Sequence, residues 1–81
     1  MTNDQIKQVV LQIISVIAPD EDLSDVRSDV PLRDQFELDS MDFLTFVEVL
    51  SARTGVRIEE ADYPRLTTMA DCVAFLTERA A

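Results

Sequence analysis

The sequence predicts an all-α fold, a small bundle of three long helices and one short helix. Three stretches carry apolar residues three and four positions apart, the spacing that gives a helix one buried face. No stretch alternates apolar and polar residues in the way that a half-buried strand does. A chain of 81 residues is enough for one small core, so we expect a single domain over residues 1–81.

The first long helix is predicted near the N-terminus. Its apolar stripe consists of Ile6, Val9, Val10, Ile13, Ile14 and Ile17. Thr2 and Gln5 have the spacing of a capping box, in which each side chain bonds the backbone amide of the other residue. Pro19 cannot continue a helix, so the helix should begin after Thr2 and end before this proline.

A long connection of about 20 residues follows, from Asp20 to Asp39, which exceeds the usual length between elements. It contains Pro31, no glycine and a few isolated apolar residues that would fix it to the core at intervals. Such a length indicates either a functional segment or a short helical turn within it. We place that turn in the segment "DLSDV", residues 22–26.

The second long helix is predicted to begin at Asp39 or Ser40, since either side chain can cap a helix. Its apolar stripe consists of Phe43, Phe46, Val47 and Leu50. Gly55 is the only glycine of the chain and should mark the end of this helix.

The short helix is predicted over Glu59–Tyr63, where Pro64 should end it. The third long helix follows, and Thr68 with Asp71 forms its cap signature. Its apolar stripe consists of Met69, Cys72, Val73, Leu76 and Ala80.

Charge and cysteine content narrow the classes of function. Sixteen acidic and seven basic residues give a net charge of −9, which repels nucleic acid and anionic membranes and favours basic protein surfaces. A single cysteine cannot form an internal disulfide, so a reducing compartment, the cytoplasm, is expected. No segment approaches the roughly 20 apolar residues of a membrane span. We expect a cytoplasmic monomer without nucleic-acid or membrane partners.

The sequence offers little to a catalytic site of its own. It has no histidine to act as the base for a serine nucleophile, and no G-x-S-x-G turn surrounds Ser40. A calcium loop starting at Asp20 would put Asp25 where glycine is needed and Pro31 where glutamate is needed. Cys72 lies on an apolar stripe without a companion ligand, so neither an enzyme nor a metal site is expected.

Ser40 remains, at a helix start where the positive end of the helix dipole favours phosphate. The surrounding segment "ELDSMDFL" resembles the attachment sequence of acyl carrier proteins, an Asp-Ser-Leu triplet at the start of the second helix. Asp39, Ser40 and Met41 match that triplet, with methionine in place of leucine. The resemblance covers nearly the whole chain, including the long first loop and the Thr-rich "RLTTMADCVAFL".

This resemblance implies a stand-alone carrier with covalent phosphopantetheine on Ser40, transferred from coenzyme A by a phosphopantetheinyl transferase. The terminal thiol of that arm would hold acyl groups as thioesters and present them to fatty-acid, lipid or polyketide-type biosynthetic enzymes. An acyl-transfer enzyme or an ATP-dependent acyl ligase with a basic surface would load it. Such a carrier needs no catalytic residues.

Two departures from the family pattern favour a specialised carrier. Glu37 replaces the glycine that usually stands two residues before the aspartate, and the second helix has fewer acids than is usual. A peptidyl or aminoacyl carrier is an alternative, although "FELDS" lacks the Gly-Gly lead of those proteins. The other alternative is an unmodified acidic adaptor that uses Ser40 only as a cap.

Two further groups of residues receive roles under this interpretation. The partner surface, next to Met41, should consist of Asp42, Leu44, Glu48, Glu59, Glu60 and Asp62. The acyl cavity should be lined by Phe43, Phe46, Val47 and Leu50. Family members generally carry a smaller residue than Phe43, so its ring would narrow the entrance or pack as an ordinary core residue.

Overall fold

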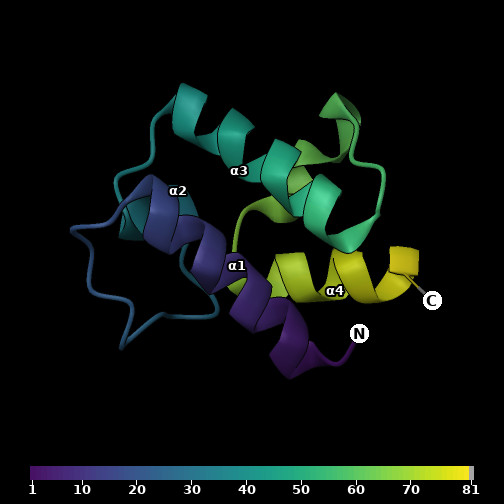
Figure 1. Cartoon of the computed structure of the whole chain (residues 1–81), viewed down its shortest axis with the longest axis horizontal. Helices are drawn as coiled ribbons and strands as arrows, with labels where there is room; N and C mark the ends of the chain where they lie inside the picture. The colour runs from purple at the N-terminus through teal and green to yellow at the C-terminus, as the bar shows by residue number, and fades with distance from the viewer. Residues whose placement is uncertain (81) are drawn as a thin grey trace.

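The computed structural model describes residues 1–80 and confirms the predicted all-α fold. None of these residues forms a strand. In chain order the helices are α1 (Asn3–Ile17), α2 (Leu32–Gln35), α3 (Ser40–Thr54), the 3₁₀ helix η1 (Glu60–Leu66) and α4 (Met69–Ala80). The three long helices are those that the sequence predicts, and α2 adds a single turn within the long connection (Figure 1).

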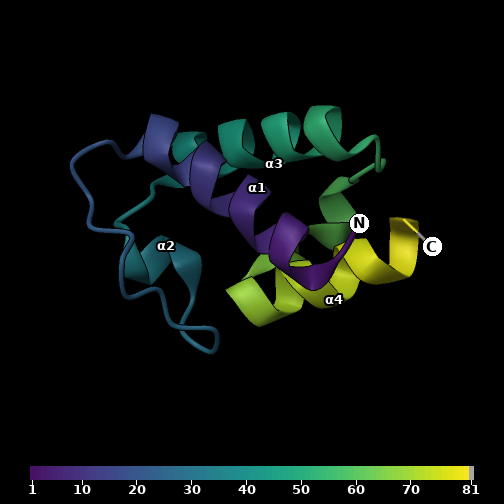
Figure 2. The same cartoon turned by 60° about the horizontal axis from the view of Figure 1, so that its bottom comes forward.

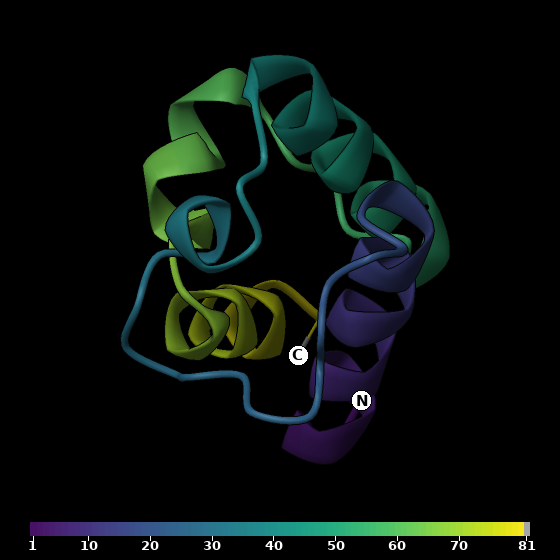
Figure 3. The ribbon, with the colours of Figure 1, turned by 90° about the vertical axis from the view of Figure 1, so that its left-hand side faces the viewer.

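Helix α1 packs against both α3 and α4, and η1 packs against α4. Figure 2 shows α1 between α3 and α4, and Figure 3 shows the helices arranged around the centre of the molecule. The start of α1 lies beside the end of α4, where the hydroxyl of Thr77 donates to Asn3 Oδ1 at 3.5 Å. Within residues 1–80, no helix combines the length and the apolar content that a membrane crossing requires.

The predicted caps of the long helices are confirmed. Thr2 and Gln5 form a reciprocal capping box with hydrogen bonds of 3.1 and 2.9 Å. Thr68 and Asp71 do the same at the start of α4, at 3.0 and 3.2 Å. Gly55 ends α3 with φ of 72°, in the left-handed region where glycine carries no steric penalty. These local signals are sufficient because each one depends on residues within a single turn of helix.

One core joins all the helices. Its buried apolar residues are Ile6, Val10, Ile13, Ile14, Leu32, Phe36, Leu38, Phe46, Val47, Leu50, Val56, Leu66, Met69, Cys72, Phe75 and Leu76. The α4 stripe differs from the prediction, since Phe75 is fully buried while Val73 is half-buried and Ala80 is exposed. The guanidinium carbons of Arg65 and Arg79 lie 5.1 and 4.7 Å from the centre of the Phe75 ring.

The helical turn predicted in residues 22–26 is wrong, because the chain makes an open turn there and α2 begins only after Pro31. The hydroxyl and the amide of Ser24 both donate to Asp22 Oδ1, at 2.7 and 2.9 Å, which competes with helical bonding. Proline is well suited to a helix start, since its φ is already helical and a free amide is not needed there.

Side-chain and backbone bonds hold the long connection in place. The side-chain amide of Gln35 bonds two residues of the connection. Its Oε1 accepts from the backbone N–H of Arg27 at 2.9 Å, and its Nε2 donates to the carbonyls of Arg27 at 2.8 Å and Val30 at 2.7 Å. Two backbone hydrogen bonds then join the connection to the end of η1 and to the first turn of α4. Leu32 donates to the carbonyl of Thr67 at 2.8 Å, and Ala70 donates to that of Ser28 at 3.1 Å.

The short helix is longer than predicted, because η1 continues through Pro64 to Leu66. A proline removes one backbone donor, and a 3₁₀ helix of two turns tolerates that loss when its ends are otherwise fixed. Glu59 donates to Asp62 Oδ2 at 3.0 Å at the start, and Leu66 is fully buried at the end. Anchoring by Leu66 therefore sets the length of η1.

Candidate functional site

Ser40 is the first helical residue of α3, and Asp39 is the residue that caps this helix. The carboxylate of Asp39 accepts a hydrogen bond from the amide of Asp42 at 2.8 Å, and the amide of Asp39 donates to Asp42 Oδ2 at 3.3 Å. The sequence leaves the cap open between Asp39 and Ser40, and the structure assigns it to Asp39. The exposed hydroxyl of Ser40 makes no hydrogen bond to any of residues 1–80.

The approach to Ser40 is fixed by a sharp turn between two buried side chains. Glu37 has φ of 53° and is the only residue other than glycine in the left-handed region among residues 1–80. Phe36 and Leu38 on either side of it are 4% and 6% exposed, so the core holds both ends of the turn. The position where the family resemblance implies glycine therefore does require the left-handed conformation.

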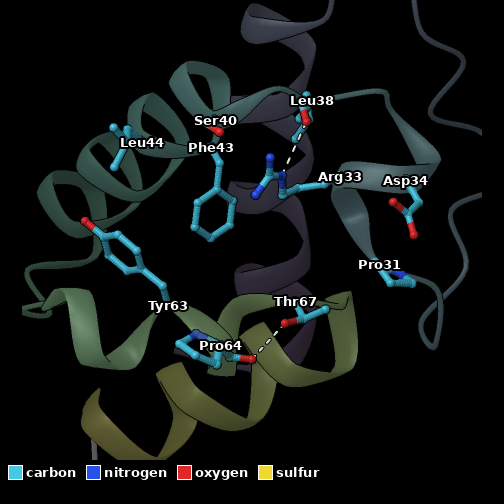
Figure 4. A pocket seen from close by; sticks show the side chains of 10 residues that line it. All are labelled: Pro31, Arg33, Asp34, Leu38, Ser40, Phe43, Leu44, Tyr63, Pro64 and Thr67. Carbon is cyan, nitrogen blue, oxygen red and sulfur yellow. Dashed lines mark hydrogen bonds between the residues drawn. The ribbon is translucent and has the colours of Figure 1, made fainter.

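Ser40 lies at the edge of a pocket of about 640 Å³ between α2, the start of α3 and η1 (Figure 4). The pocket is lined by Pro31, Arg33, Asp34, Leu38, Ser40, Phe43, Leu44, Tyr63, Pro64 and Thr67. Phe43 projects into it from α3, and its ring meets the ring of Tyr63 edge to face, with centres 5.6 Å apart. The pocket thus places the exposed Ser40 beside a largely apolar and aromatic lining.

Arg33 is the single cationic side chain of the pocket lining. Its guanidinium carbon lies 5.7 Å from the centre of the Phe43 ring, and its Nε donates to the carbonyl of Leu38 at 3.4 Å. No carboxylate among residues 1–80 forms an ion pair with it. Asp34 lines the same pocket, and in Figure 4 it lies on the far side of Arg33 from the Phe43 ring.

Sequence reasoning does not identify Arg33 as a site residue. It lies in the long connection, outside every apolar stripe and every recognisable motif. Its neighbours in the pocket come from three separate segments, residues 31–38, 40–44 and 63–67, which only the tertiary fold brings together. The one sequence signal is its place two residues after Pro31, in a short segment that leads to Ser40.

The residues predicted to line an acyl cavity separate into two groups. Phe43 is half-buried and lines the pocket beside Ser40. Phe46, Val47 and Leu50 lie deeper, with exposures of 1%, 3% and 0%, and belong to the core. Phe43 contacts that core through Phe46, whose ring centre is 6.1 Å away, so it stands between the pocket and the interior.

The residues predicted to bind partners lie on α3, on η1 and at Glu59, which directly precedes η1. Met41 and Leu44 are 70% and 39% exposed, and Glu48 is exposed on the same helix. Asp42 is half-buried and engaged in the α3 cap. The helical spacing thus correctly predicts that Met41, Leu44 and Glu48 are accessible.

Two of the three acids at η1 are held by arginines. Glu59 pairs with Arg57 at 3.0 Å, and Asp62 pairs with Arg79 at 3.1 Å. The backbone hydrogen bond from Glu59, with the positive charge of Arg79 as a smaller cause, lowers the pKa of Asp62 below its ordinary value. Glu60 is exposed and has no ion-pair partner within residues 1–80.

Cys72 is fully buried in α4, as its stripe position predicts. Burial, with a smaller effect of the neighbouring Asp71 carboxylate, raises the pKa of its thiol to about 12. The thiolate is the reactive form, so this cysteine is inert near neutral pH. Ser40, in contrast, is exposed.

A comparison with known protein families matches residues 4–76 to the family described as phosphopantetheine attachment site. The match includes the α3 start, the pocket and the whole core. Phosphopantetheine is attached covalently in domains of this family. A search of curated proteins finds no match to the chain.

Proposed function

This chain belongs to the phosphopantetheine attachment-site family, and we propose that Ser40 is the residue that carries the phosphopantetheine. The observation that supports this proposal most is that Asp39, and not Ser40, caps α3. Asp39 caps the helix, so the neighbouring Ser40 hydroxyl is exposed and unbonded within residues 1–80. The Asp-Ser-Met triplet and the positive end of the α3 dipole further support a phosphate at this oxygen.

A phosphopantetheinyl transferase would use coenzyme A and magnesium to modify Ser40. The Ser40 Oγ forms a phosphodiester bond, the adenosine bisphosphate part of coenzyme A leaves, and the hydroxyl proton passes to a base of the transferase. When attached, the phosphopantetheine supplies a terminal thiol that holds an acyl group as a thioester. Asp39 keeps the α3 start in helical geometry, which presents Ser40 to the transferase in one orientation.

The cargo that we propose is an acyl group, delivered to fatty-acid, lipid or polyketide-type biosynthetic enzymes. The apolar and aromatic lining beside Ser40 favours an acyl chain over a polar aminoacyl group. A chain in this pocket would pass Phe43 before it could approach Phe46, Val47 and Leu50. In this proposal residues 1–81 form one carrier domain that performs no catalysis itself.

Partner enzymes would bind across α3 and η1. Met41 and Leu44 provide exposed apolar contacts, and Glu48 and Glu60 provide negative charge without an ion-pair partner in residues 1–80. The net charge of −9 would steer this surface towards basic patches on acyl-transfer enzymes or acyl ligases. Asp42, Glu59 and Asp62 add negative charge to the same surface while serving as caps or ion-pair partners.

Intact-mass measurement tests the attachment residue. Incubation with a promiscuous transferase, magnesium and coenzyme A should add the mass of one phosphopantetheine to the wild type and none to Ser40→Ala. Ser28→Ala is the matched control, because Ser28 is also exposed, and this variant should be modified fully. Equal modification of Ser40→Ala would exclude Ser40 as the site.

The cargo class is tested on protein purified from its own cells. Hydroxylamine cleaves the thioester, and the mass of the released hydroxamate distinguishes an acyl chain from an amino acid. An aminoacyl hydroxamate would favour the peptidyl-carrier alternative, and an acyl hydroxamate supports the proposal.

A further inference from the structure

Arg33 is the only cation in the lining of the Ser40 pocket, which is mostly apolar and also includes the carboxylate of Asp34. Arg57, Arg65 and Arg79 each form an ion pair with a carboxylate, whereas Arg27, Arg33 and Arg53 form none within residues 1–80. The guanidinium of Arg33 donates to the Leu38 carbonyl and lies over the face of the Phe43 ring. Of the three arginines without an ion pair in residues 1–80, only Arg33 lines the Ser40 pocket. Its terminal guanidinium nitrogens are available to an anion that is not part of the polypeptide.

We propose that Arg33 binds the phosphodiester formed on Ser40 and that this ion pair seats the pantetheine arm in the pocket against Phe43 and Tyr63. This inference rests on the proposed function, because it requires phosphate on Ser40. A phosphodiester carries one negative charge on two oxygens, which matches the two-pronged geometry of a guanidinium. The same pocket lining contains both Ser40 and Arg33.

The geometry of Arg33 supports this role. The contact with Phe43 and the long hydrogen bond from Nε hold the guanidinium on the pocket side, which reduces the rotamer freedom that it would lose on binding. Figure 4 shows the guanidinium beside the Phe43 ring, and Ser40 lies above that ring in the same view. The phosphate would thus meet a partly ordered cation.

The rest of the lining suits the arm beyond the phosphate. The pantetheine part begins with a methylene group, which is followed by a carbon that bears two methyl groups, and it continues through two amides. Phe43, Tyr63 and Pro31 offer apolar surface to the methyl groups, and the hydroxyl of Tyr63 offers a polar partner to the amides. One cation at the phosphate with aromatic surface beyond it forms a site for this arm specifically.

Nuclear magnetic resonance of the loaded protein tests the proposal. Isotope-filtered spectra of wild type carrying unacylated phosphopantetheine should show Overhauser contacts from the arm's two methyl groups to the Phe43 and Tyr63 rings. Arg33→Gln should lose these contacts. Arg57→Gln is the matched control, since it removes the same charge from an exposed arginine outside the pocket, and it should retain them.

The wild type gives a second measurement that needs no variant. The Arg33 Nε–H resonance should shift between the unmodified and the loaded protein, and added salt should reverse the shift by screening the ion pair. Retained contacts in Arg33→Gln, or an Arg33 resonance that does not shift on loading, would overturn the proposal. Failure of Ser40 to accept phosphopantetheine would instead overturn the proposed function, and the mass measurement reveals that first.

Discussion

Asp39 and Asp42 exchange two hydrogen bonds across the first turn of α3, the shorter of them 2.8 Å long, with Ser40 between them in sequence. A serine at a helix start commonly serves as the cap itself. Here the adjacent Asp39 caps the helix, so the Ser40 hydroxyl is not needed to stabilise the start of α3.

The separation of roles predicts different effects of two neighbouring substitutions on stability. Asp39→Ala should lower the free energy of unfolding by about 1 kcal/mol, the usual effect of losing a cap. Ser40→Ala should change it by less than about 0.5 kcal/mol, since the hydroxyl bonds nothing within residues 1–80. Urea unfolding followed by circular dichroism measures both values. A larger loss for Ser40→Ala than for Asp39→Ala would contradict the assignment of the cap.

The left-handed conformation of Glu37 predicts a stabilising substitution. Glu37→Gly should raise the free energy of unfolding by about 0.5–1 kcal/mol, because relief of the left-handed strain exceeds the added entropy of the unfolded chain. Glu48→Gly is the control, since it removes the same charge from a helix interior and should cost about 1 kcal/mol. Thermal unfolding of the wild type, Glu37→Gly and Glu48→Gly measures these differences in stability. Equal destabilisation by the two glycines would mean that Glu37 is not strained.

Burial of Cys72 predicts the thiol count of the protein. Because burial raises the pKa of this thiol to about 12, a disulfide reagent at neutral pH should find no thiol in the folded, unmodified chain. It should find one in the phosphopantetheinylated chain, at the arm. Denaturant should add one thiol to each count. Rapid reaction of the folded, unmodified chain would show that Cys72 is accessible.

The raised pKa of the Cys72 thiol predicts that the free energy of unfolding falls between pH 9.0 and about 12. An unfolded cysteine ionises near its ordinary pKa of 9.0, whereas the folded one keeps its proton to about 12. Between these values the unfolded state binds fewer protons, so the free energy of unfolding falls as pH rises. Cys72→Ala should lack this part of the pH dependence, and unfolding measured across this range tests it.

The position of Phe43 between the pocket and the core predicts how acyl chains are held. Phe43→Ala should lower stability by about 2 kcal/mol, less than for a fully buried ring, because the side chain is half-buried. If the ring narrows the entrance, the variant should protect a long-chain thioester on Ser40 from hydroxylamine better than the wild type does. Met41→Ala, on the exposed side of α3, serves as the control. Unchanged or weaker protection in folded Phe43→Ala would leave Phe43 as a packing residue.

The acidic surface predicts a salt-sensitive encounter with the transferase. Glu48→Lys should lower the association rate more than it raises the dissociation rate, since charge acts chiefly on diffusional encounter. Asp4→Lys makes the same change of charge on exposed α1 and should have a smaller effect. Stopped-flow binding at several salt concentrations gives both rates. Rates that are independent of salt would rule out electrostatic steering.

The long helices and their caps could be predicted because both depend on residues within a few turns of one another. The stripe through Ile6 and the box of Thr2 with Gln5 are local features, and the structure has both. The burial of Phe75 also had a local signal, since it lies three residues after Cys72, but the predicted stripe followed Val73 instead.

The connecting elements and the pocket could not be predicted because their causes are distant in sequence. Helix α2 depends on a bond from Leu32 to Thr67, and η1 continues past Pro64 because Leu66 reaches the core. Arg33 gains its place only when α2 and α3 approach each other. The sequence motif therefore identifies the residues of the attachment triplet. Only the fold identifies the pocket residues around the triplet, such as Arg33.

Two backbone hydrogen bonds fix one side of the pocket, and the opposite side has none among residues 1–80. The bond from Leu32 to Thr67 joins the α2 side of the pocket to the end of η1, and the bond from Ala70 to Ser28 joins the long connection to the first turn of α4. No backbone hydrogen bond among residues 1–80 joins α3 to η1, where the rings of Phe43 and Tyr63 meet. We therefore expect bulky cargo to part α3 from η1 while slow amide exchange at Leu32 persists, so that one carrier fits cargo of different widths without loosening its fold.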